Sequence, residues 1–348
     1  MYDEKTDKFM NRIKWSRLLL MLSIGFFFWQ CSGNKKEYYE ASGFVFGTSF
    51  KILYSSNNGE LPCVVFDSLF SIINRSLSPF EEQSIISRVN RSEEVEIDSF
   101  FSHVFLAAQT ISKQTNGAFD ITVAPLVNAW GFGFEHWDSI TPSTIDSLRQ
   151  FVGYQKVVLR ENRIIKENPG VMLDCSAIAK GYSCDVVANY FREQGISDYM
   201  IEVGGEIVTK GLNSRGKEWV IGITQPSDEN SVLSPDLQER IVLGNGAMAT
   251  SGNYRQFYYK DGHRYAHTIN PVTGYPVEHS LLSVTVLADD CMTADALATA
   301  FMVMGLDSAL TFVENRSDLA AYFIYSDEND EFKVIYTPSF ENHLIKNN

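Results

Sequence analysis

Two hard oxygen ligands stand four positions apart in the stretch TADALATAF, where Asp295 precedes Thr299. The surrounding pattern predicts a helix from Thr293 to Met304, with Thr293 as its cap and Gly305 as its stop. Residues four apart lie one above the other on a helix, so the carboxylate and the hydroxyl share one face. Such a pair suits Mg²⁺ when substrate phosphates and water complete its shell. An aspartate near a helix start is more often a dipole or capping choice, so the pair alone establishes no metal site.

A second candidate is the stretch VMLDCSAIAKGYSCD, in which an apolar strand delivers Asp174 to the start of a helix. Small residues open this helix and let a ligand approach the backbone: Ser176, Ala177, Ala179 and Gly181. The unpaired N–H groups and positive dipole end of a helix start attract an anion, and Lys180 adds positive charge. Capping by Asp174 and tight helix packing explain the same residues equally well.

The third candidate is His267 in YAHTINPVTG, on the second strand of a hairpin predicted by the preceding Asp-Gly pair. The strand period of two places His263, Tyr265, His267 and Ile269 on one face, where they could line a cleft. An imidazole titrates near neutrality and can accept a proton from a hydroxyl. A histidine that only fills a turn is the competing interpretation.

The elements that must position these residues alternate along the chain. Strands are expected at residues 44–54, 199–203, 218–224, 239–243 and 281–288, and hairpins near residues 161–162, 257–269 and 327–329. Helices are expected at residues 64–77, 177–195 and 293–304, and from the cap Asp98 to about Thr115, where Asn116-Gly117 ends the helix. This mixture predicts an α+β fold with mixed, largely antiparallel sheets flanked by helices, in two intimately packed halves.

Composition limits the possible partners. The chain has 348 residues, 45% of them hydrophobic, and can bury a large core. Its formal net charge of −14 argues against a nucleic-acid partner, because phosphate backbones need a basic face. An anionic ligand would therefore need a metal ion or local lysines to offset the repulsion.

The first thirty residues resemble an export signal. Basic residues precede an apolar run at positions 18–29 that is short for a membrane span and suits a signal-peptide core. Cys31, followed by Ser32 and Gly33, resembles the lipidated cysteine of a bacterial lipoprotein, although Gln30 is atypical. We expect residues 1–30 to be the targeting segment, 31–40 a tether and 41–348 one domain. Release by signal peptidase and an uncleaved anchor are the alternatives.

The other cysteines are Cys63, Cys175, Cys184 and Cys291. They show no spacing typical of zinc ligands, and Cys175 and Cys184 are expected on opposite sides of one helix. We therefore expect buried free thiols.

Seven stretches, in order, resemble the ApbE family of flavin transferases, which attach FMN to proteins and were formerly called thiamine-biosynthesis lipoproteins. They are LSPFEEQSIISRVN, GAFDITVAPLVNAWGFG, LDCSAIAKGYSCD, EVGGEI, ATSGNYRQF, HTINPVTG and TADALATAF, and they span roughly residues 40–310. The resemblance implies a fold related to the T-fold, FAD as substrate, AMP as by-product, and a threonine hydroxyl of a partner protein as acceptor. The partners would be exported redox-protein subunits.

The resemblance also assigns roles to residues. It implies Mg²⁺ held by the backbone carbonyl of Ala177 with Asp295 and Thr299, and His267 as general base. It places FAD contacts at Phe46, Phe80, Ala118, Phe119, Asp120, Asp174, Lys180 and Ile269. Phe80 stands where tyrosine is common, and Asn270 where aspartate is frequent.

Together these features predict an Mg²⁺-dependent FAD:protein FMN transferase, anchored through lipidated Cys31 to the periplasmic face of the bacterial inner membrane. Mg²⁺ would offset the charge that grows on departing AMP. An Mg²⁺-dependent FAD pyrophosphatase, which uses water as acceptor, and a non-catalytic flavin-binding lipoprotein are the alternatives. The second would lack the metal ligands or His267, which are present.

Overall fold

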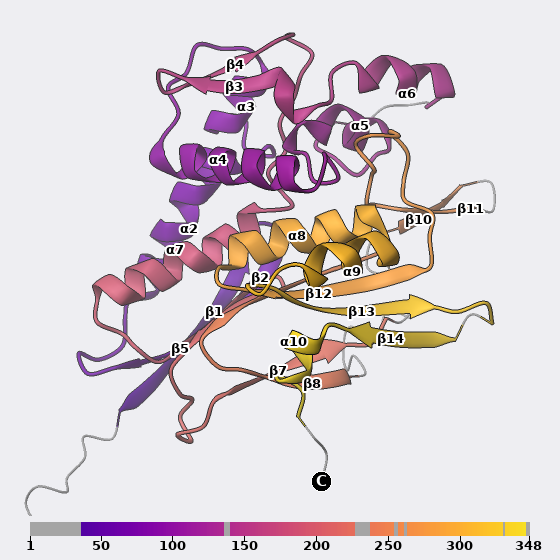
Figure 1. Ribbon diagram of the computed structural model, residues 1–348. Coiled ribbons are helices and arrows are strands. Elements are labelled where there is room, and N and C mark those ends of the chain that lie inside the picture. The colour runs from indigo at the N-terminus through magenta and orange to yellow at the C-terminus, as the bar shows by residue number, and fades with distance from the viewer. Residues whose placement is uncertain are drawn as a thin grey trace, which may run out of the picture. The chain divides into compact units, whose positions relative to one another are not determined.

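Eight strands form the main sheet in a computed structural model of the chain (Figure 1). In spatial order they are β1 (Glu37–Val45), β2 (Thr48–Ser56), β5 (Tyr199–Val203), β6 (Glu206–Lys210), β9 (Gly246–Gly252), β12 (Leu281–Ala288), β13 (Ala320–Ser326) and β14 (Phe332–Tyr336). Each neighbouring pair from β2 to β14 is antiparallel. The structure describes residues 36–135, 140–226, 237–253, 257–260, 263–329 and 331–345.

The remaining strands pair in two-stranded ribbons: β3 (Val157–Arg160) with β4 (Arg163–Lys166), β7 (Trp219–Thr224) with β8 (Leu237–Leu243), and β10 (Phe257–Lys260) with β11 (His263–Ala266). The helices are α2 (Cys63–Leu77), α3 (Ile85–Asn90), α4 (Ser99–Gln114), α5 (Ala124–Ala129), α6 (Pro142–Arg149), α7 (Ala179–Glu193), α8 (Cys291–Met304), α9 (Leu306–Glu314) and α10 (Pro338–Glu341). Helices with antiparallel sheets confirm the predicted α+β class.

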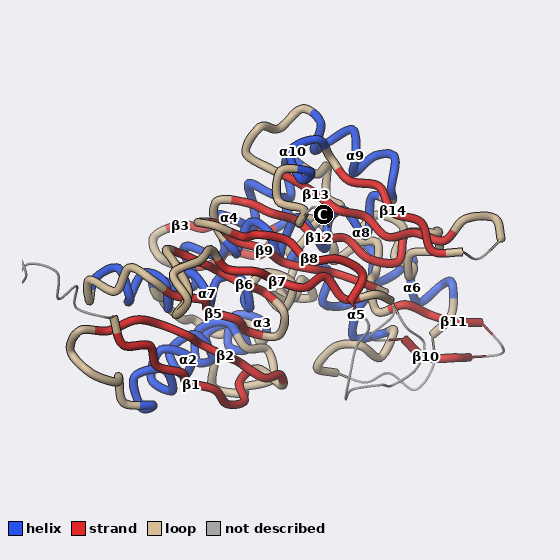
Figure 2. Tube along the Cα trace, turned by 90° about the horizontal axis from the view of Figure 1, so that it is seen from below, coloured by secondary structure: helices blue, strands red, loops and turns tan. Residues whose placement is uncertain are grey.

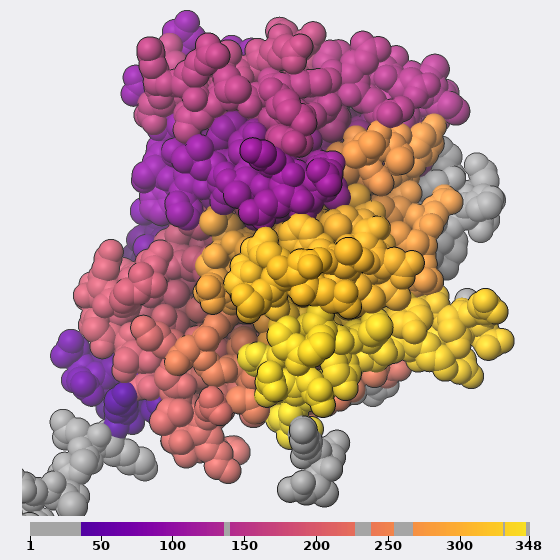
Figure 3. Space-filling view, in the orientation of Figure 1, coloured from indigo at the N-terminus to yellow at the C-terminus, as the bar shows by residue number. Residues whose placement is uncertain are grey.

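The elements of residues 38–348, which form one compact unit, lie in layers. Helices α7 and α8 cover one face of the main sheet, and the β7–β8 ribbon with α10 covers the other (Figure 1, Figure 2). Side chains of α8 pack with β9 and β12 in one core cluster, while β7, β8 and α10 share another with β6 and β13. On the face seen in Figure 3, α4 (purple) lies directly above α8 and α9 (gold). The α8 segment is therefore enclosed between the sheet and α4, which explains its almost continuous burial.

Local signals predicted several elements correctly. Asp98 caps α4 by accepting the Phe101 N–H at 2.8 Å, and Asn116 and Gly117 end the helix with positive φ. The β3–β4 hairpin turns at residues 161–162 as predicted, and β10 and β11 pair as expected from the Asp-Gly signal. The hairpin of β13 and β14 was likewise predicted.

Other predictions were wrong in detail. Residues 44–54 are not one strand, because Phe46 and Gly47 adopt positive φ of 52° and 75° and turn the chain between β1 and β2. Helix α7 begins at Ala179, two residues later than expected. Helix α8 begins at Cys291, and its cap is Asp290, which accepts the Thr293 N–H at 2.8 Å. Strands β6 and β9 and helix α9 were not predicted from the sequence.

Residues 1–37 form a separate unit, of which the structure describes only Lys36 and Glu37. The predicted signal segment and Cys31 lie outside the described residues. Strand β1 begins at Glu37, inside the segment expected to be a tether. Among the described residues, no helix combines the length and apolar character needed to span a membrane.

The described cysteines are all free thiols. Cys175, Cys184 and Cys291 are buried, as predicted, whereas Cys63 is exposed because it opens α2 at the surface. Cys175 lies before the first residue of α7, so it does not share a helix with Cys184.

Candidate active site

Helices α7 and α8 approach each other closely at Gly181. A Cβ atom there would lie 2.2 Å from the Cys291 carbonyl oxygen and 2.8 Å from Asp295 Cβ, so only glycine fits without a shift. The Gly181 N–H donates to Asp295 Oδ2 at 3.0 Å. Further along α7, Asp185 accepts the N–H groups of Cys291 and Met292 at 3.0 and 2.8 Å and thereby caps α8. These contacts fix Asp295 against the start of α7.

Lys180 lies between two carboxylates at this junction. Its Nζ is 3.2 Å from Glu206 Oε1 and 3.5 Å from Asp295 Oδ1. Glu206 and Asp295 are 3% and 5% exposed, whereas the Lys180 side chain keeps 29% of its surface exposed. Gly204, with φ of 67°, closes the arrangement, because a Cβ there would lie 3.3 Å from Lys180 Cδ. We call Lys180, Glu206 and Asp295 the charged cluster.

Burial and attraction act in opposite directions on the charged cluster. Burial raises the pKa of Glu206, and the Lys180 ammonium opposes that rise. Burial lowers the pKa of Lys180, but Asp295 and Glu206 together outweigh it and raise that pKa, so the ammonium stays charged. Glu206 Oε2 is buried without a hydrogen-bond partner among the described residues.

Asp295, one of the predicted metal ligands, lies at the same junction. The Gly181 N–H lies in the first turn of α7, where backbone N–H groups have no partner within the helix, and Asp295 accepts it. Asp295 is buried and Thr299 half-buried one turn further along α8. Within the described part of the chain no three His, Cys, Asp or Glu side chains gather as a metal site. The predicted set contains one carboxylate with a carbonyl and a hydroxyl, which fits Mg²⁺ that takes its remaining ligands from phosphate and water.

The predicted FAD contacts directly after α4 are Ala118, Phe119 and Asp120, and most of them are already engaged by hydrogen bonds or core packing within the protein. Asp120 Oδ1 accepts from the Thr122 N–H at 2.8 Å and Oδ2 from the Tyr154 N–H at 2.7 Å. Burial raises the pKa of Asp120 despite these bonds. Phe119 is 2% exposed and its ring lies in the core, so a flavin contact there would have to come from backbone. Ala118 is half-buried.

Asp174 lies beside this segment, because its N–H donates to the Ile121 carbonyl at 2.7 Å. Its Oδ1 accepts from both the N–H and the hydroxyl of Ser176, at 2.8 and 2.5 Å. Burial raises the pKa of Asp174, and the Ser176 bonds oppose that rise. Asp174 therefore forms a local turn with Ser176 and does not cap α7, whose cap position is Ile178, so the capping interpretation was wrong.

His267 lies one position beyond β11, which ends at Ala266, so the prediction of a strand histidine was wrong by one residue. It precedes a tight turn in which Asn270 Oδ1 accepts the N–H groups of Val272 and Thr273 at 2.9 and 3.1 Å. Ile269 also lies outside the strand, buried and bridged to Pro276. The turn, rather than a sheet, therefore sets the position of both residues.

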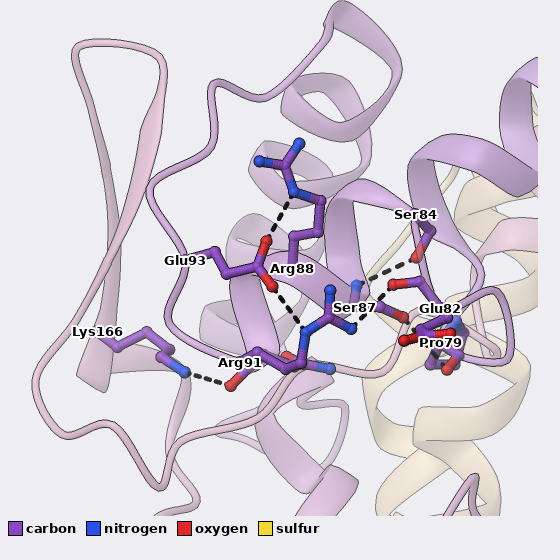
Figure 4. A network of polar contacts seen from close by, with 9 residues as sticks. Pro79, Glu82, Ser84, Ser87, Arg88, Arg91, Glu93 and Lys166 are labelled. Carbon is purple, nitrogen blue, oxygen red and sulfur yellow. Dashed lines mark hydrogen bonds and ion pairs between the residues drawn. The ribbon is translucent and has the colours of Figure 1, made fainter.

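Phe80 is 69% exposed on a loop that polar contacts hold in place (Figure 4). Arg91 donates from Nη1 to the Glu82 carbonyl at 2.9 Å and from Nε to Glu93 at 2.8 Å. Ser84 caps α3 directly after the loop. An exposed aromatic ring on a fixed loop is available to a planar ligand. Phe46, on the turn between β1 and β2, is instead partly buried against both neighbouring core clusters.

The segment after α5 connects Phe80 with His267. Phe134 meets Phe80 edge to face, with ring centroids 6.3 Å apart, and Phe132 meets the His267 ring edge to face at 6.4 Å. We call the loops that carry Phe80, Phe132, Phe134 and His267 the aromatic loops. Phe132 belongs to the stretch GAFDITVAPLVNAWGFG, but the family resemblance gave it no role.

Asn128 fixes this segment. Its Oδ1 accepts the N–H groups of Phe134 and Glu135 at 3.0 and 3.3 Å, and the residue is 1% exposed. A Cβ at Gly133 would lie 1.9 Å from that oxygen, so a side chain there would displace Asn128. Trp130 Nε1 donates to the Gly274 carbonyl at 2.8 Å and ties the segment to the turn after His267.

The structure thus brings Lys180 and Asp295 together and adds Glu206, which sequence reasoning missed. Its signal was a carboxylate directly after Gly204-Gly205 in the otherwise apolar start of a strand. A cavity of about 310 Å³, lined by Thr48, Gly204, Gly205, Thr224 and Thr250 among others, adjoins this cluster through Gly204. A larger hollow of about 420 Å³ between α4 and the start of α8 contains none of the predicted site residues.

The profile of the ApbE family matches residues 46–323. This chain belongs to the ApbE family. The FAD:protein FMN transferase of Vibrio cholerae is 38% identical over 320 residues, which cover 89% of this chain and 94% of that protein. The FAD:protein FMN transferase of Haemophilus influenzae is 37% identical over 303 residues, 83% of this chain and 86% of that protein.

Solved structures of ApbE proteins share the fold. The flavin transferase ApbE from Vibrio cholerae superposes with a TM-score of 0.80 at 37% identity, covering 89% of this chain and 100% of that one. The apo form of the Pseudomonas stutzeri flavinyl transferase ApbE gives a TM-score of 0.78 at 28% identity, covering 89% and 97%. Both likenesses agree with the antiparallel sheet and helix layers described above.

Proposed function

We propose that this ApbE-family protein transfers FMN from FAD to a threonine hydroxyl of a partner protein and releases AMP. The observation that carries the proposal is the charged cluster, where Lys180 and Asp295 meet at the start of α7. The relatives named FAD:protein FMN transferase cover most of this chain and support the same activity.

The reaction breaks the phosphoanhydride bond of FAD and forms a phosphoester bond to threonine. The threonine oxygen attacks the phosphorus on the FMN side of FAD, and the bond from that phosphorus to the bridging oxygen breaks. AMP leaves with the bridging oxygen and its electron pair. His267 accepts the threonine proton, because a neutral hydroxyl is a poor nucleophile and an imidazole titrates near the working pH. Phe132, which meets the His267 ring edge to face, would orient that ring.

Lys180 positions the pyrophosphate group of FAD. Its ammonium is charged and partly exposed at the junction of α7 and α8, and α7 presents its N-terminal end at the same place. These groups attract an anion in a protein whose net charge is −14. Phe80 offers an exposed ring to the isoalloxazine or adenine of FAD.

The carbonyl of Ala177, the Asp295 carboxylate and the Thr299 hydroxyl would hold Mg²⁺. When bound, Mg²⁺ neutralises charge on the pyrophosphate oxygens as AMP departs. Asp295 is fixed for this role by the Gly181 N–H, which occupies its Oδ2 and leaves Oδ1 directed toward the Lys180 ammonium.

The cellular location of the protein is inferred from its N-terminal sequence. The protein would be exported and anchored through a lipidated Cys31 to the periplasmic face of the inner membrane, where exported redox subunits would supply the acceptor threonine. Replacing Cys31 with serine should move the protein to the soluble fraction. A membrane-bound fraction with the mass of the precursor would instead indicate an uncleaved anchor.

The proposal is tested by mixing the full-length protein with FAD, Mg²⁺ and a candidate exported redox subunit. Flavin fluorescence that stays with the subunit in a denaturing gel supports transfer. A subunit whose acceptor threonine is replaced by alanine is the matched control. Fluorescence that is absent from every candidate subunit, while FAD is consumed, would favour the pyrophosphatase alternative.

A further inference from the structure

Lys180 and a divalent cation would compete for the Asp295 carboxylate. The Lys180 Nζ is 3.5 Å from Asp295 Oδ1, and Asp295 supplies the one carboxylate among the proposed metal ligands. Two cations on one carboxylate repel each other, and burial strengthens the repulsion because little water screens it. A site that binds both needs a further negative charge on the lysine side.

Glu206 is placed to supply that charge. Its Oε1 lies 3.2 Å from Lys180 Nζ, on strand β6, whereas Asp295 reaches the same ammonium from α8. Two other carboxylates lie nearby: Asp185 has both oxygens engaged by the N–H groups of Cys291 and Met292, and Asp174 has one oxygen engaged by Ser176 and makes no ion pair with Lys180 among the described residues. Glu206 is therefore the carboxylate that can hold the ammonium independently of Asp295.

The surroundings of Glu206 suggest that its charge serves more than packing. It is 3% exposed, and its buried Oε2 has no hydrogen-bond partner among the described residues. Burying such an oxygen costs free energy that an apolar side chain would avoid. The Lys180 ammonium is the group that offsets this cost.

We propose that Glu206 is a positioning residue that holds the Lys180 ammonium as a counter-charge, so that Asp295 stays available to a divalent cation. The inference rests on the metal site of the proposed function. It predicts that removing the Lys180 charge strengthens the binding of Mg²⁺ and that removing the Glu206 charge weakens it.

The experiment is a calorimetric titration of the full-length protein with Mg²⁺ in the absence of FAD, at pH 8.5. Lys180→Met should bind Mg²⁺ about tenfold more tightly, because a competing positive charge is gone. Glu206→Gln should bind it about tenfold more weakly, because the ammonium then depends on Asp295 alone. Lys180→Arg, which keeps the charge, should show no such tightening.

The ion pair of Lys51 and Glu40 provides matched controls, because both side chains are largely exposed on β2 and β1. Lys51→Met and Glu40→Gln should leave the affinity for Mg²⁺ unchanged within twofold, since exposed charges are screened. If Glu206→Gln fails to fold, Glu206→Asp makes the same test, because its shorter side chain withdraws the carboxylate from the Lys180 ammonium and should weaken Mg²⁺ binding in the same direction.

An affinity that Lys180→Met lowers or leaves unchanged would overturn the inference. So would a folded Glu206→Gln that binds Mg²⁺ like the wild type. If the wild type still transfers FMN with Mg²⁺ in those cases, the proposed function stands without the inference. A wild type that binds no Mg²⁺, with or without FAD, would overturn both the inference and the metal part of the proposed function.

Discussion

The charged cluster and the aromatic loops are built in different ways. Lys180, Glu206 and Asp295 come from α7, β6 and α8, and close backbone approaches at Gly181 and Gly204 position them. The aromatic loops come from connections outside regular elements, and amide side chains such as Asn128 position them. Packed backbone holds the first region, whereas side-chain hydrogen bonds within loops hold the second, and such bonds yield more readily than packed backbone.

This difference separates two kinds of task. A buried ion cluster needs fixed distances, because its energies depend steeply on separation and on exclusion of water. A base and ring contacts that meet a large flavin and a protein acceptor need access from solvent. Substitutions in the charged cluster should therefore affect binding and stability together, and substitutions in the aromatic loops should affect turnover or affinity with little effect on stability.

The largest effect is expected at His267. The variant His267→Asn should fold and bind FAD but lose transfer by a factor of about 10² to 10⁴, the range for removing a general base. The melting temperature and the dependence of rate on pH, measured on one preparation, check this. A less stable but fully active variant would show that His267 only fills its turn.

Gly181→Ala tests the rigid region. The added Cβ would lie 2.2 Å from the Cys291 carbonyl oxygen, which belongs to backbone and cannot move alone. We expect a loss of about 3 kcal/mol in the free energy of unfolding, as for an overpacked core. Denaturant unfolding measures it, and Gly246→Ala, at a position without positive φ where a Cβ would make only ordinary contacts, controls for the cost of replacing glycine. Equal losses in both variants would contradict the close approach.

Gly133→Ala makes the corresponding change in the aromatic loops. The Cβ would meet Asn128 Oδ1 at 1.9 Å, but a side chain and a loop can yield. We expect only about 1 kcal/mol of destabilisation. Turnover should fall about tenfold, because displaced Phe132 and Phe134 rings disturb His267 and Phe80. A stability loss as large as that of Gly181→Ala would remove the distinction between the two regions.

Phe80→Ala should have the smallest effect. The ring is 69% exposed, so its removal should leave the melting temperature unchanged while the KM for FAD rises about threefold to tenfold. Phe80→Tyr should lower KM if a hydroxyl at this position bonds FAD, as the family resemblance implies. Steady-state kinetics with both variants decide, and a KM unaffected by either substitution would place FAD elsewhere.

The sequence predicted elements whose signals are local. The cap Asp98 and the turn Asn116-Gly117 bound α4 correctly, because capping and left-handed backbone depend on nearby residues. The turn at Phe46 was missed, because an aromatic residue with positive φ is uncommon and the apolar alternation continues through it. His267 was placed on a strand that ends one residue earlier, since the period of two does not show where pairing stops.

The contacts of the site depend on distant parts of the chain, and periodicity does not report them. Spacing on one helix found Asp295 and Thr299, but the partner Glu206 lies on a strand nearly ninety positions away from Asp295. Phe119 appeared as a candidate ring surface, and only the packing of the core shows that it is enclosed. The family resemblance supplied the substrate, which neither spacing nor packing identifies.

The central claim is tested most directly by counting both products of one reaction. Full-length protein is incubated with FAD, Mg²⁺ and an acceptor subunit, and mass spectrometry measures FMN bound to threonine while chromatography measures AMP. We expect equal amounts of FMN bound to threonine and of free AMP. With the His267→Asn variant, we expect both products only at the residual rate of that variant. AMP released in full without FMN on the acceptor would contradict the proposed transfer.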